Sequence, residues 1–273
     1  MKAMPPIVVI DGHNLLWCAH NGFPARIKDR SGQDITGLFG FFALLRLILT
    51  DIGEELDCVV CFDGEIGSEA RARSLISYKT DRLAQPEPIN HLPNIKSGLD
   101  ALDIPWLEQR RLEADDLVAA ICRRHRGRQI TIVSTDRDFY QLIDEHVSVR
   151  APKRGAQAVT EAVVLARYGV APSQWCDFRS ITGDRSDNVP GIAGLGDRRA
   201  SRLLSEGRSL DDLFGERLAR DRFHQMILDN EKLLRLNQRT LRLDGLASLP
   251  KLTLGRISTP LPLARDVLLA VAV

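Results

Sequence analysis

Residues 7–11 read IVVID, a run of four β-branched residues that ends in an aspartate. The run is apolar on both faces of a strand, as is typical of strands buried in a parallel sheet. Two more runs have the same form: CVVCF at 58–62 precedes Asp63, and ITIVS at 130–134 precedes Thr135 and Asp136. Helical patterns separate the three runs. The sequence therefore predicts an α/β fold, an open and mostly parallel sheet flanked by helices.

The helical patterns divide the chain into two parts. Residues 37–52 are apolar at helical spacing, another helix is expected to end at 99–102, and residues 113–124 carry acids in the first turn and arginines in the last, as the helix dipole favours. After about Ala158 no strong strand pattern follows. Helices are instead expected near 161–168, 173–182, 197–205 and 216–238, and residues 240–273 give no clear pattern. We predict an α/β core over 1–160 and a helical part over 161–273.

The composition is that of an ordinary globular protein. Of 273 residues, 44% are hydrophobic and 27% charged, which excludes a disordered or fibrous chain. The net charge of +1 neither requires nor excludes a nucleic-acid partner. No apolar run approaches the roughly 18–20 residues of a membrane span, and the first apolar run meets Asp11 too soon for a secretory signal. We expect a cytoplasmic protein with no membrane partner.

A zinc site is disfavoured by the placement of the cysteines. Cys58 and Cys61 form a C-x-x-C motif, but the motif lies inside a predicted strand. Residues three apart on a strand face opposite sides, so the two thiols are poorly placed to bind one metal. Buried, reduced cysteines are the better interpretation.

Acids follow each of the three predicted strands. One such aspartate is most simply a helix cap or a turn residue. The carboxyl ends of parallel strands share one edge of the sheet, however, and three carboxylates side by side repel one another unless a cation neutralises them. More acids begin the helix at 113–124 and lie in the turn GDRSDNVPG at 183–191. The candidate metal ligands are Asp11, Asp63, Glu113, Asp115, Asp116, Asp136, Asp138, Asp184 and Asp187.

These ligands indicate the kind of ion and reaction. Carboxylate oxygens alone select hard cations, Mg²⁺ or Mn²⁺. Nine carboxylates exceed what one octahedral Mg²⁺ uses, whereas two ions roughly 3.5–4 Å apart fit the two-metal arrangement of phosphodiester hydrolysis.

Two basic segments suggest a nucleic-acid partner. The turn GIAGLG at 191–196 precedes a helix with Arg198, Arg199 and Arg202. It does not follow a strand, so a helix-hairpin-helix element at about 181–205 that holds a nucleic-acid backbone fits better than a dinucleotide site. Arg71, Tyr78, Lys79 and Arg82 precede the proline-rich stretch 86–93. Alone they would be a solvated helix face, but beside a phosphate-handling edge they could steer a substrate.

Several segments together resemble the 5′-nuclease (flap endonuclease, 5′–3′ exonuclease) family, in particular the nuclease domain of bacterial DNA polymerase I in a free-standing form. They follow the family's order and cover about residues 7–240. The matching segments are IDGHNLL at 10–16, FDG at 62–64, Tyr78-Lys79 with Arg82, LEADDLVA at 112–119, STDRDFYQL at 134–142 and ITGDRSDNVPGIAGLG at 181–196.

The resemblance implies a PIN-like form of this open sheet, followed by the helical part with its helix-hairpin-helix element. It also implies a metal-dependent, structure-specific 5′-nuclease of DNA replication and repair that uses a two-metal mechanism. Asp11, Asp63, Glu113 and Asp115 then resemble ligands of a first ion, with Asp116 close by. The second site would use Asp136, Asp138, Asp184 and Asp187, and Asp115 could be shared.

The resemblance also assigns the basic residues and the partner. A helical arch would span about 65–98, with Lys79 and Arg82 as catalytic cations. DNA contacts would come from Arg71, Tyr78, Gly194, Gly196, Arg198 and Arg199. The partner would be DNA with a 5′ end, a flap or a single-strand/duplex junction, bound by a monomer. A K⁺ ion is expected at the hairpin loop.

Two departures from the family pattern and two alternatives remain. Ala70 replaces an aromatic residue, and Asp197-Arg198-Arg199 replaces the usual Lys-Thr turn, which bears on K⁺ coordination. The alternatives are a PIN-type single-strand ribonuclease and a non-catalytic DNA-structure-binding protein.

Overall fold

The computed structural model describes residues 4–75, 77–78, 88–216, 220–245, 249 and 254–271. Its centre is a six-stranded sheet in the order β3-β2-β1-β4-β5, with β6 also beside β2. All neighbouring strands are parallel except β6, which runs antiparallel to β2. The strands are β1 (Ile7–Asp11), β2 (Glu55–Phe62), β3 (Trp106–Glu108), β4 (Ile130–Val133), β5 (Val147–Arg150) and β6 (Gly255–Ser258).

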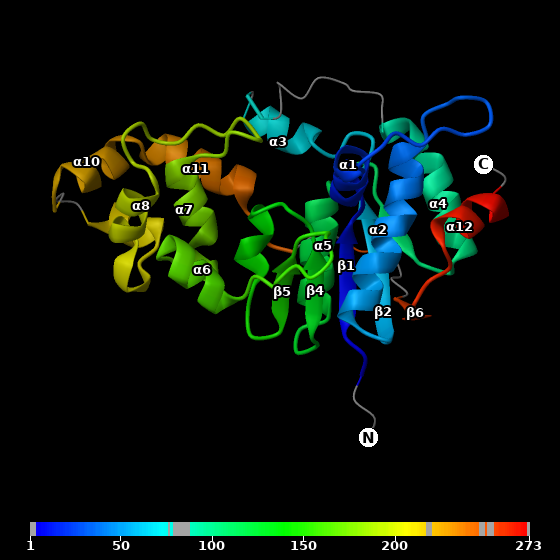
Figure 1. The fold of residues 1–273 in the computed structure, drawn as a ribbon. Coiled ribbons are helices and arrows are strands. Elements are labelled where there is room, and N and C mark those ends of the chain that lie inside the picture. The colour runs from blue at the N-terminus through cyan, green and yellow to red at the C-terminus, as the bar shows by residue number, and fades with distance from the viewer. Residues whose placement is uncertain are drawn as a thin grey trace.

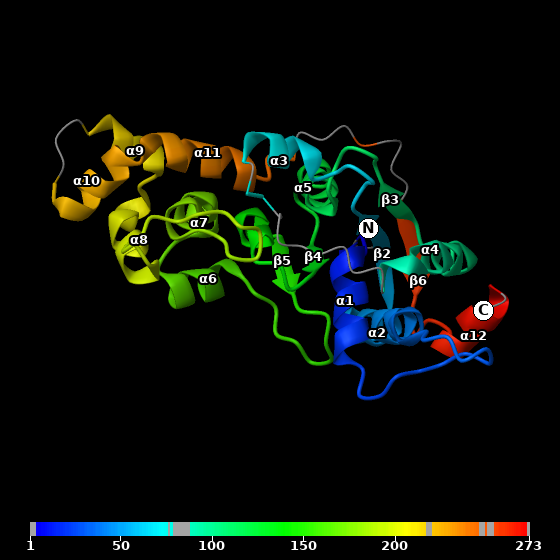
Figure 2. The ribbon, with the colours of Figure 1, turned by 90° about the horizontal axis from the view of Figure 1, so that it is seen from above.

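Helices cover both faces of the sheet (Figures 1 and 2). Val8 and Ile10 of β1 pack in the core beneath α1, α2, α4 and α12, whereas Ile7 and Val9 pack in the core beneath α5. The sheet is therefore buried on both sides, as its apolar strands predicted. The helices on its faces are α1 (Gly12–Gly22), α2 (Thr36–Ile52), α4 (Leu92–Ala101), α5 (Ala114–Arg124) and α12 (Ala264–Ala270), whereas α3 (Glu69–Ser74) contacts the helical part described next.

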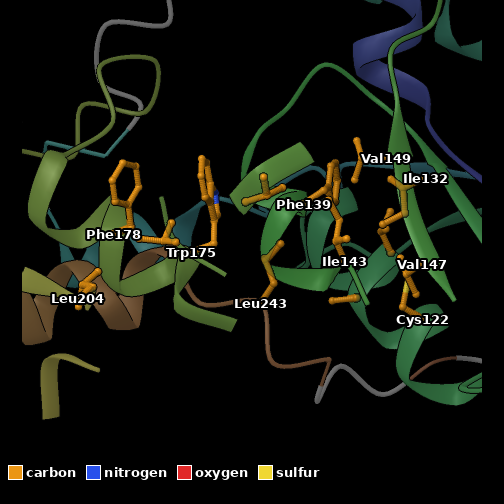
Figure 3. Close-up of a cluster of buried hydrophobic side chains, with 14 of the residues drawn as sticks. Cys122, Ile132, Phe139, Ile143, Val147, Val149, Trp175, Phe178, Leu204 and Leu243 are labelled. Carbon is orange, nitrogen blue, oxygen red and sulfur yellow. The ribbon is translucent and has the colours of Figure 1, made fainter. Parts of the chain in front are cut away.

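A second, helical part continues from β5. Its helices are α6 (Glu161–Tyr168), α7 (Trp175–Thr182), α8 (Asp197–Leu203), α9 (Leu210–Gly215), α10 (Arg222–Asp229) and α11 (Glu231–Leu241). One apolar cluster runs from the sheet into this part, from Ile132 through Phe139 to Trp175 and Phe178 (Figure 3). The helical part thus shares a hydrophobic core with the sheet and is not joined to it by a linker alone.

The three predicted strands and most predicted helices are confirmed. The stretch 216–238 differs, because it holds two helices, α10 and α11. Asn230 separates them, and its side-chain amide donates to the carbonyl oxygen of Met226 (2.8 Å), which satisfies one of the last carbonyls of α10. The placement of Cys58 and Cys61 on opposite faces of β2 is also confirmed, since the two thiols lie in different cores.

The end of the described chain returns to the sheet. β6 pairs with β2 and α12 packs on α2 and α4, so residues 255–271 lie with the α/β core although the sequence division placed 161–273 in the helical part. The reason is the weakness of the signal: GRIS at 255–258 buries only Ile257 and lacks the apolar run of the other strands.

Among the helices of the described residues, none combines the length and the apolar character needed to cross a membrane.

Candidate metal centre and nucleic-acid interface

Asp11 is the last residue of β1 and caps α1, so its carboxylate lies at the carboxyl edge of the sheet. Its oxygens accept hydrogen bonds from the backbone N of Asn14 (3.0 Å) and from Oγ of Ser134 (2.9 Å). Burial raises the pKa of Asp11 to about 7, and repulsion from Asp63 and Asp136 adds to this against the two hydrogen bonds. A cation bound here would offset both the cost of burying the charged Asp11 carboxylate and its repulsion by Asp63 and Asp136.

The acids after β2 and β4 are fixed at the same edge. Oδ1 of Asp63 accepts from the backbone N of Ala114 at the start of α5 (2.7 Å). His13 Nδ1 accepts from the backbone N of Asp63 (3.1 Å) and lies 3.7 Å from its Oδ2. Oδ1 of Asp136 accepts from the backbone N of Asp138 (2.8 Å). Backbone donors thus hold both carboxylates in place.

Asp138 joins this edge to the loop after α7. It is 7% exposed, and burial raises its pKa well above the usual value. Repulsion from Asp136, Asp184 and Asp187 acts in the same direction. These four acids come from two separate segments of the sequence, 136–138 and 184–187, and they are close enough in space to influence one another.

Asp184 already has a positive partner. Arg179 of α7 forms an ion pair with it, and Ser186 donates to it through the backbone N (2.7 Å) and the hydroxyl. Burial acts to raise the pKa of Asp184, but the hydrogen bonds from Ser186 and the pairing with Arg179 outweigh it and hold the pKa below its usual value.

The third group lies at the start of α5. Glu113 caps this helix and is 2% exposed, and its backbone N donates to Oδ2 of Asp116 (3.2 Å). Arg71 of α3 pairs with Glu113 and with Asp116 (2.7 Å), and it also attracts Asp115 electrostatically. The hydroxyl of Tyr78 donates to Oε2 of Glu113 (3.1 Å). Arg71 therefore supplies the positive charge of this group.

The nine acids lie at one edge of the sheet, but they do not form a preformed metal site. In the described ranges, no group of three or more His, Cys, Asp or Glu residues is arranged to hold a metal ion. Arg71 and Arg179 occupy several of the carboxylates instead. The donors are nonetheless all oxygens, and burial, with repulsion among the acids added to it, raises the pKa values of Asp11 and Asp138. The site fits a hard divalent cation.

Sequence reasoning missed the polar residues that support these acids. Asn14 and Thr135 form a reciprocal pair, in which the Asn14 amide donates to Oγ1 of Thr135 (2.7 Å) and the Thr135 backbone N donates back (3.0 Å). Asn14 follows Asp11 by three residues, and Ser134-Thr135 directly precede Asp136. Their nearness in the sequence to these two aspartates could have indicated their supporting role. Nothing in the sequence indicated Arg179.

A cavity of about 580 Å³ adjoins the acids, between the sheet and the helical part. Its lining includes Asp136 and Asp184 together with three cations, Arg137, Arg179 and Arg185. A phosphate in this cavity would meet positive charge beside the candidate metal ligands.

The predicted arch lies only partly within the described residues. Lys79 and Arg82 fall outside them. Tyr78 is 5% exposed and faces Glu113, and Arg71 faces the acids at the start of α5. Both residues therefore contact the acidic edge, and their DNA contacts stay a prediction.

In the glycine turn at 191–196 the backbone passes so close to the end of α7 that only glycine fits. A Cβ on Gly191 would lie 2.3 Å from the last carbonyl oxygen of α7, and Gly194 has φ +86°. Gly196 caps α8. Arg198 and Arg199 are exposed at the start of that helix, and Arg199 donates to the carbonyl oxygen of Gly194. The turn thus presents two guanidinium groups beside a tight backbone loop.

Two family models match the chain. One is described as the 5′–3′ exonuclease N-terminal resolvase-like domain and matches residues 6–169; the other, the 5′–3′ exonuclease C-terminal SAM fold, matches residues 170–254. A thermostable DNA polymerase I of Thermus filiformis is 34% identical over 96% of this chain and 30% of its own length. DNA polymerase I of Deinococcus radiodurans is 34% identical over 83% of this chain and 24% of its own length. The chain thus spans under a third of these relatives.

Solved structures resemble the fold. The T5 5′-exonuclease superposes with a TM-score of 0.66 at 19% identity, covering 89% of each chain. A bacteriophage T5 flap endonuclease, crystallised with DNA and metal ions, gives a TM-score of 0.64 at 20% identity over 88% of this chain and 89% of its own. At these identities the likeness shows the fold alone.

Proposed function

The chain belongs to the 5′–3′ exonuclease family, and we propose that it is a divalent-metal-dependent, structure-specific 5′-nuclease. Its substrate would be DNA with a 5′ end, a flap or a single-strand/duplex junction, in replication or repair. The observation that carries this proposal is the buried carboxyl of Asp11, whose pKa rises to about 7 beside Asp63 and Asp136. The T5 flap endonuclease of similar fold, crystallised with DNA and metal ions, supports the same class of substrate and cofactor.

The nine acids would hold two Mg²⁺ or Mn²⁺ ions. Asp11, Asp63, Glu113 and Asp115 would bind the first, with Asp116 beside them. Asp136, Asp138, Asp184 and Asp187 would bind the second. Such ions activate a water and offset charge on the phosphate and the leaving oxygen.

The chain's own groups prepare the edge for this chemistry. Ser134 and the backbone of Asn14 orient the Asp11 carboxylate, and the backbone of Ala114 orients that of Asp63. Groups held in advance need no reorganisation when charge develops on the substrate. Lys79 and Arg82 would neutralise charge on the reacting phosphate, in keeping with the family pattern.

Arg71 would have two roles. It is paired with Glu113 and Asp116, and metal ions at those carboxylates would replace the charge it supplies. Its guanidinium would then be available to a substrate phosphate, which it can bind with two parallel hydrogen bonds.

The glycine turn would bind the duplex. Gly194, Gly196, Arg198 and Arg199 would contact the backbone without reading sequence, so affinity should fall steeply with salt. A K⁺ ion at the turn, a monomeric state and a cytoplasmic location complete the proposal.

One assay separates this function from its rivals. Labelled 5′-flap DNA, the matched RNA and a blunt duplex are each incubated with Mg²⁺ or with EDTA. We expect Mg²⁺-dependent cleavage of the flap DNA. Cleavage of RNA alone would identify a PIN-type ribonuclease, and flap binding without any Mg²⁺-dependent cleavage would identify a non-catalytic DNA-binding protein.

A further inference from the structure

The loop 183–191 carries Asp184 and Asp187, the two proposed ion ligands that come from the helical part. Both aspartates are buried, with exposed fractions of 6% and 5%. Asp184 and Val189 pair across the loop through two backbone hydrogen bonds of 2.9 and 2.8 Å. The loop is therefore a short hairpin, and the position of its two acids depends on what holds its ends.

The two ends of this loop meet at a pair of glycines. A Cβ on Gly183 would lie 2.4 Å from the backbone N of Gly191, which is closer than van der Waals contact allows. We call this narrow point, where α7 ends and the glycine turn begins, the neck of the loop. A small shift at the neck would move both aspartates together.

Asn237 of α11 holds the neck from the interior of the helical part, where it is 0% exposed. Its side-chain amide donates to the carbonyl oxygen of Ser180 (3.0 Å) and to that of Pro190 (2.7 Å). Ser180 precedes the two aspartates and Pro190 follows them. Carbonyl oxygens in the last turn of a helix lack an intrahelical partner, so Asn237 satisfies one at the end of α7 while it joins both ends of the loop to α11.

The amide of Asn237 is not explained by packing. Its Oδ1 is buried and has no hydrogen-bond partner among the residues that the structure describes. An apolar side chain of similar size would avoid the cost of this unpaired oxygen. The two donated hydrogen bonds explain the amide, because without them the buried carbonyl oxygens of Ser180 and Pro190 would lose these donors.

The segment after α3 contacts the loop from the other side. Oγ of Ser77 donates to the carbonyl oxygen of Asn188 (3.0 Å). Val189 belongs to the same small apolar cluster as Tyr78. These contacts reach the distal part of the loop, whereas those of Asn237 reach both of its ends.

We propose that Asn237 is a positioning residue for the second ion, because it fixes the loop that presents Asp184 and Asp187. This inference rests on the proposed function and deepens it. Asn237 acts through the backbone at the neck, so its loss should weaken the second ion. The first ion should be unaffected, because its proposed ligands follow β1 and β2 and begin α5.

The test compares Asn237→Leu, which removes the two donors and the unpaired oxygen at similar volume, with Gln238→Leu. Gln238 is the matched control, because it is the next residue of α11, is 7% exposed and donates from its amide to Asp177 (2.7 Å) instead of to the neck. Hydrogen exchange is measured by mass spectrometry in EDTA. The peptide spanning 183–191 should exchange about tenfold faster in Asn237→Leu and at the wild-type rate in Gln238→Leu.

Mn²⁺ binding is then measured by titration calorimetry. Asn237→Leu should weaken the second ion about tenfold and leave the affinity of the first unchanged. Single-turnover cleavage of flap DNA should be slow at low Mn²⁺ and recover at saturating Mn²⁺. Added ion does not repair a misfolded protein, so this recovery separates positioning from a general loss of structure.

Three results would overturn the inference: unchanged exchange of the loop in Asn237→Leu, equally fast exchange in Gln238→Leu, or equal weakening of both ions. If Asn237→Leu does not fold, Asn237→Asp keeps the shape and places oxygens against the two carbonyls. It should give the same pattern, and wild-type exchange and Mn²⁺ binding by that variant count against the inference.

Failure of the proposed function gives a different result. A wild-type protein that binds no Mn²⁺ would refute the metal-dependent nuclease. Exchange in EDTA needs no ion, so it still decides whether Asn237 holds the loop.

Discussion

Two buried aspartates at opposite ends of the same sheet have opposite surroundings. Asp11, at the carboxyl end of β1, is 7% exposed and has other acids as neighbours, which together with burial raise its pKa to about 7. Asp57, near the amino end of β2, is 6% exposed and lies 2.6 Å from both Arg128 and Arg256. Burial acts to raise the pKa of Asp57, but the two arginines prevail and lower it.

The difference separates stability from function within one fold. At the amino edge two arginines match the charge of Asp57, and Asp57 ties β2 to β6 through Arg256, its partner in the register of the two strands. At the carboxyl edge negative charge accumulates without full compensation, which costs stability and leaves a site for cations.

We expect the largest effect from Asp136→Ala, which removes one carboxylate from the carboxyl edge of the sheet. Asp136 interacts with both Asp11 and Asp138, so it lies between the two proposed ion sites. Turnover of flap DNA should fall by roughly 10³-fold or more, about 4 kcal/mol of transition-state stabilisation, while flap affinity in Ca²⁺ largely survives. Single-turnover cleavage and anisotropy measure the two effects.

The matched control is Asp266→Asn on α12, whose described ion pair is with the adjacent Arg265. It should cleave at the wild-type rate. Near-normal cleavage by Asp136→Ala would contradict the assignment of metal ligands.

Breaking the amino edge should give the reverse pattern. Asp57→Asn leaves Arg128, whose side chain is 15% exposed, without its partner. Removing one member of a buried ion pair should lower the free energy of unfolding by about 3 kcal/mol, and cleavage per folded molecule should be unchanged. Arg256→Gln should cost less, because the side chain of Arg256 is 56% exposed and Arg128 remains. Urea unfolding at pH 7 measures both, and equal stability of Asp57→Asn and wild type would refute the contrast.

Acid should act oppositely at the two edges. A lowered pKa means that Asp57 stabilises the fold above its usual pKa near 3.8 and that this contribution is lost as pH falls through the lower, folded value. A raised pKa means that the protonated Asp11 does not destabilise the fold below pH 3.8. The free energy of unfolding then falls as pH rises from 3.8 through about 7, because the buried carboxyl must lose its proton.

We therefore expect Asp11→Asn to stabilise the metal-free protein by about 2 kcal/mol at pH 8 and not at pH 3.5, as measured by unfolding in EDTA. Saturating Mn²⁺ should reverse the order, because the variant lacks a ligand and gains less from binding. A variant no more stable than wild type at pH 8 in EDTA would show that Asp11 is not destabilised by its neighbours.

These contrasts also show what the sequence could predict. Asp11, Asp63 and Asp136 were identifiable because each ends an apolar strand run, and parallel strands bring such ends to one edge. The cations that balance the acids gave no such signal. Arg179 belongs to a helix five residues before its partner Asp184, and Arg71 lies 42 residues from Glu113.

The amino edge was less predictable still. Asp57 and Arg256 are 199 residues apart, and β6 buries only Ile257, so neither periodicity nor spacing revealed the pair. Long-range charge pairing depends on which short strands meet, and that is decided by packing of the whole sheet rather than by local pattern.

The smallest expected effect tests whether Arg71 substitutes for a metal ion at the carboxyl edge. Its guanidinium pairs with Glu113 and Asp116, and the side chain is 12% exposed. Burial opposes the charge of Arg71, yet attraction to these acids raises its pKa. Arg71→Gln should therefore leave the acids more negative and tighten Mn²⁺ binding about fivefold, roughly 1 kcal/mol, while cleavage slows because a phosphate contact is lost.

Arg73→Gln, on the same helix with a side chain 81% exposed, is the control and should alter neither property. Titration calorimetry with Mn²⁺ distinguishes the roles: weaker Mn²⁺ binding by Arg71→Gln would mean that Arg71 organises the acids for the ion instead of competing with it.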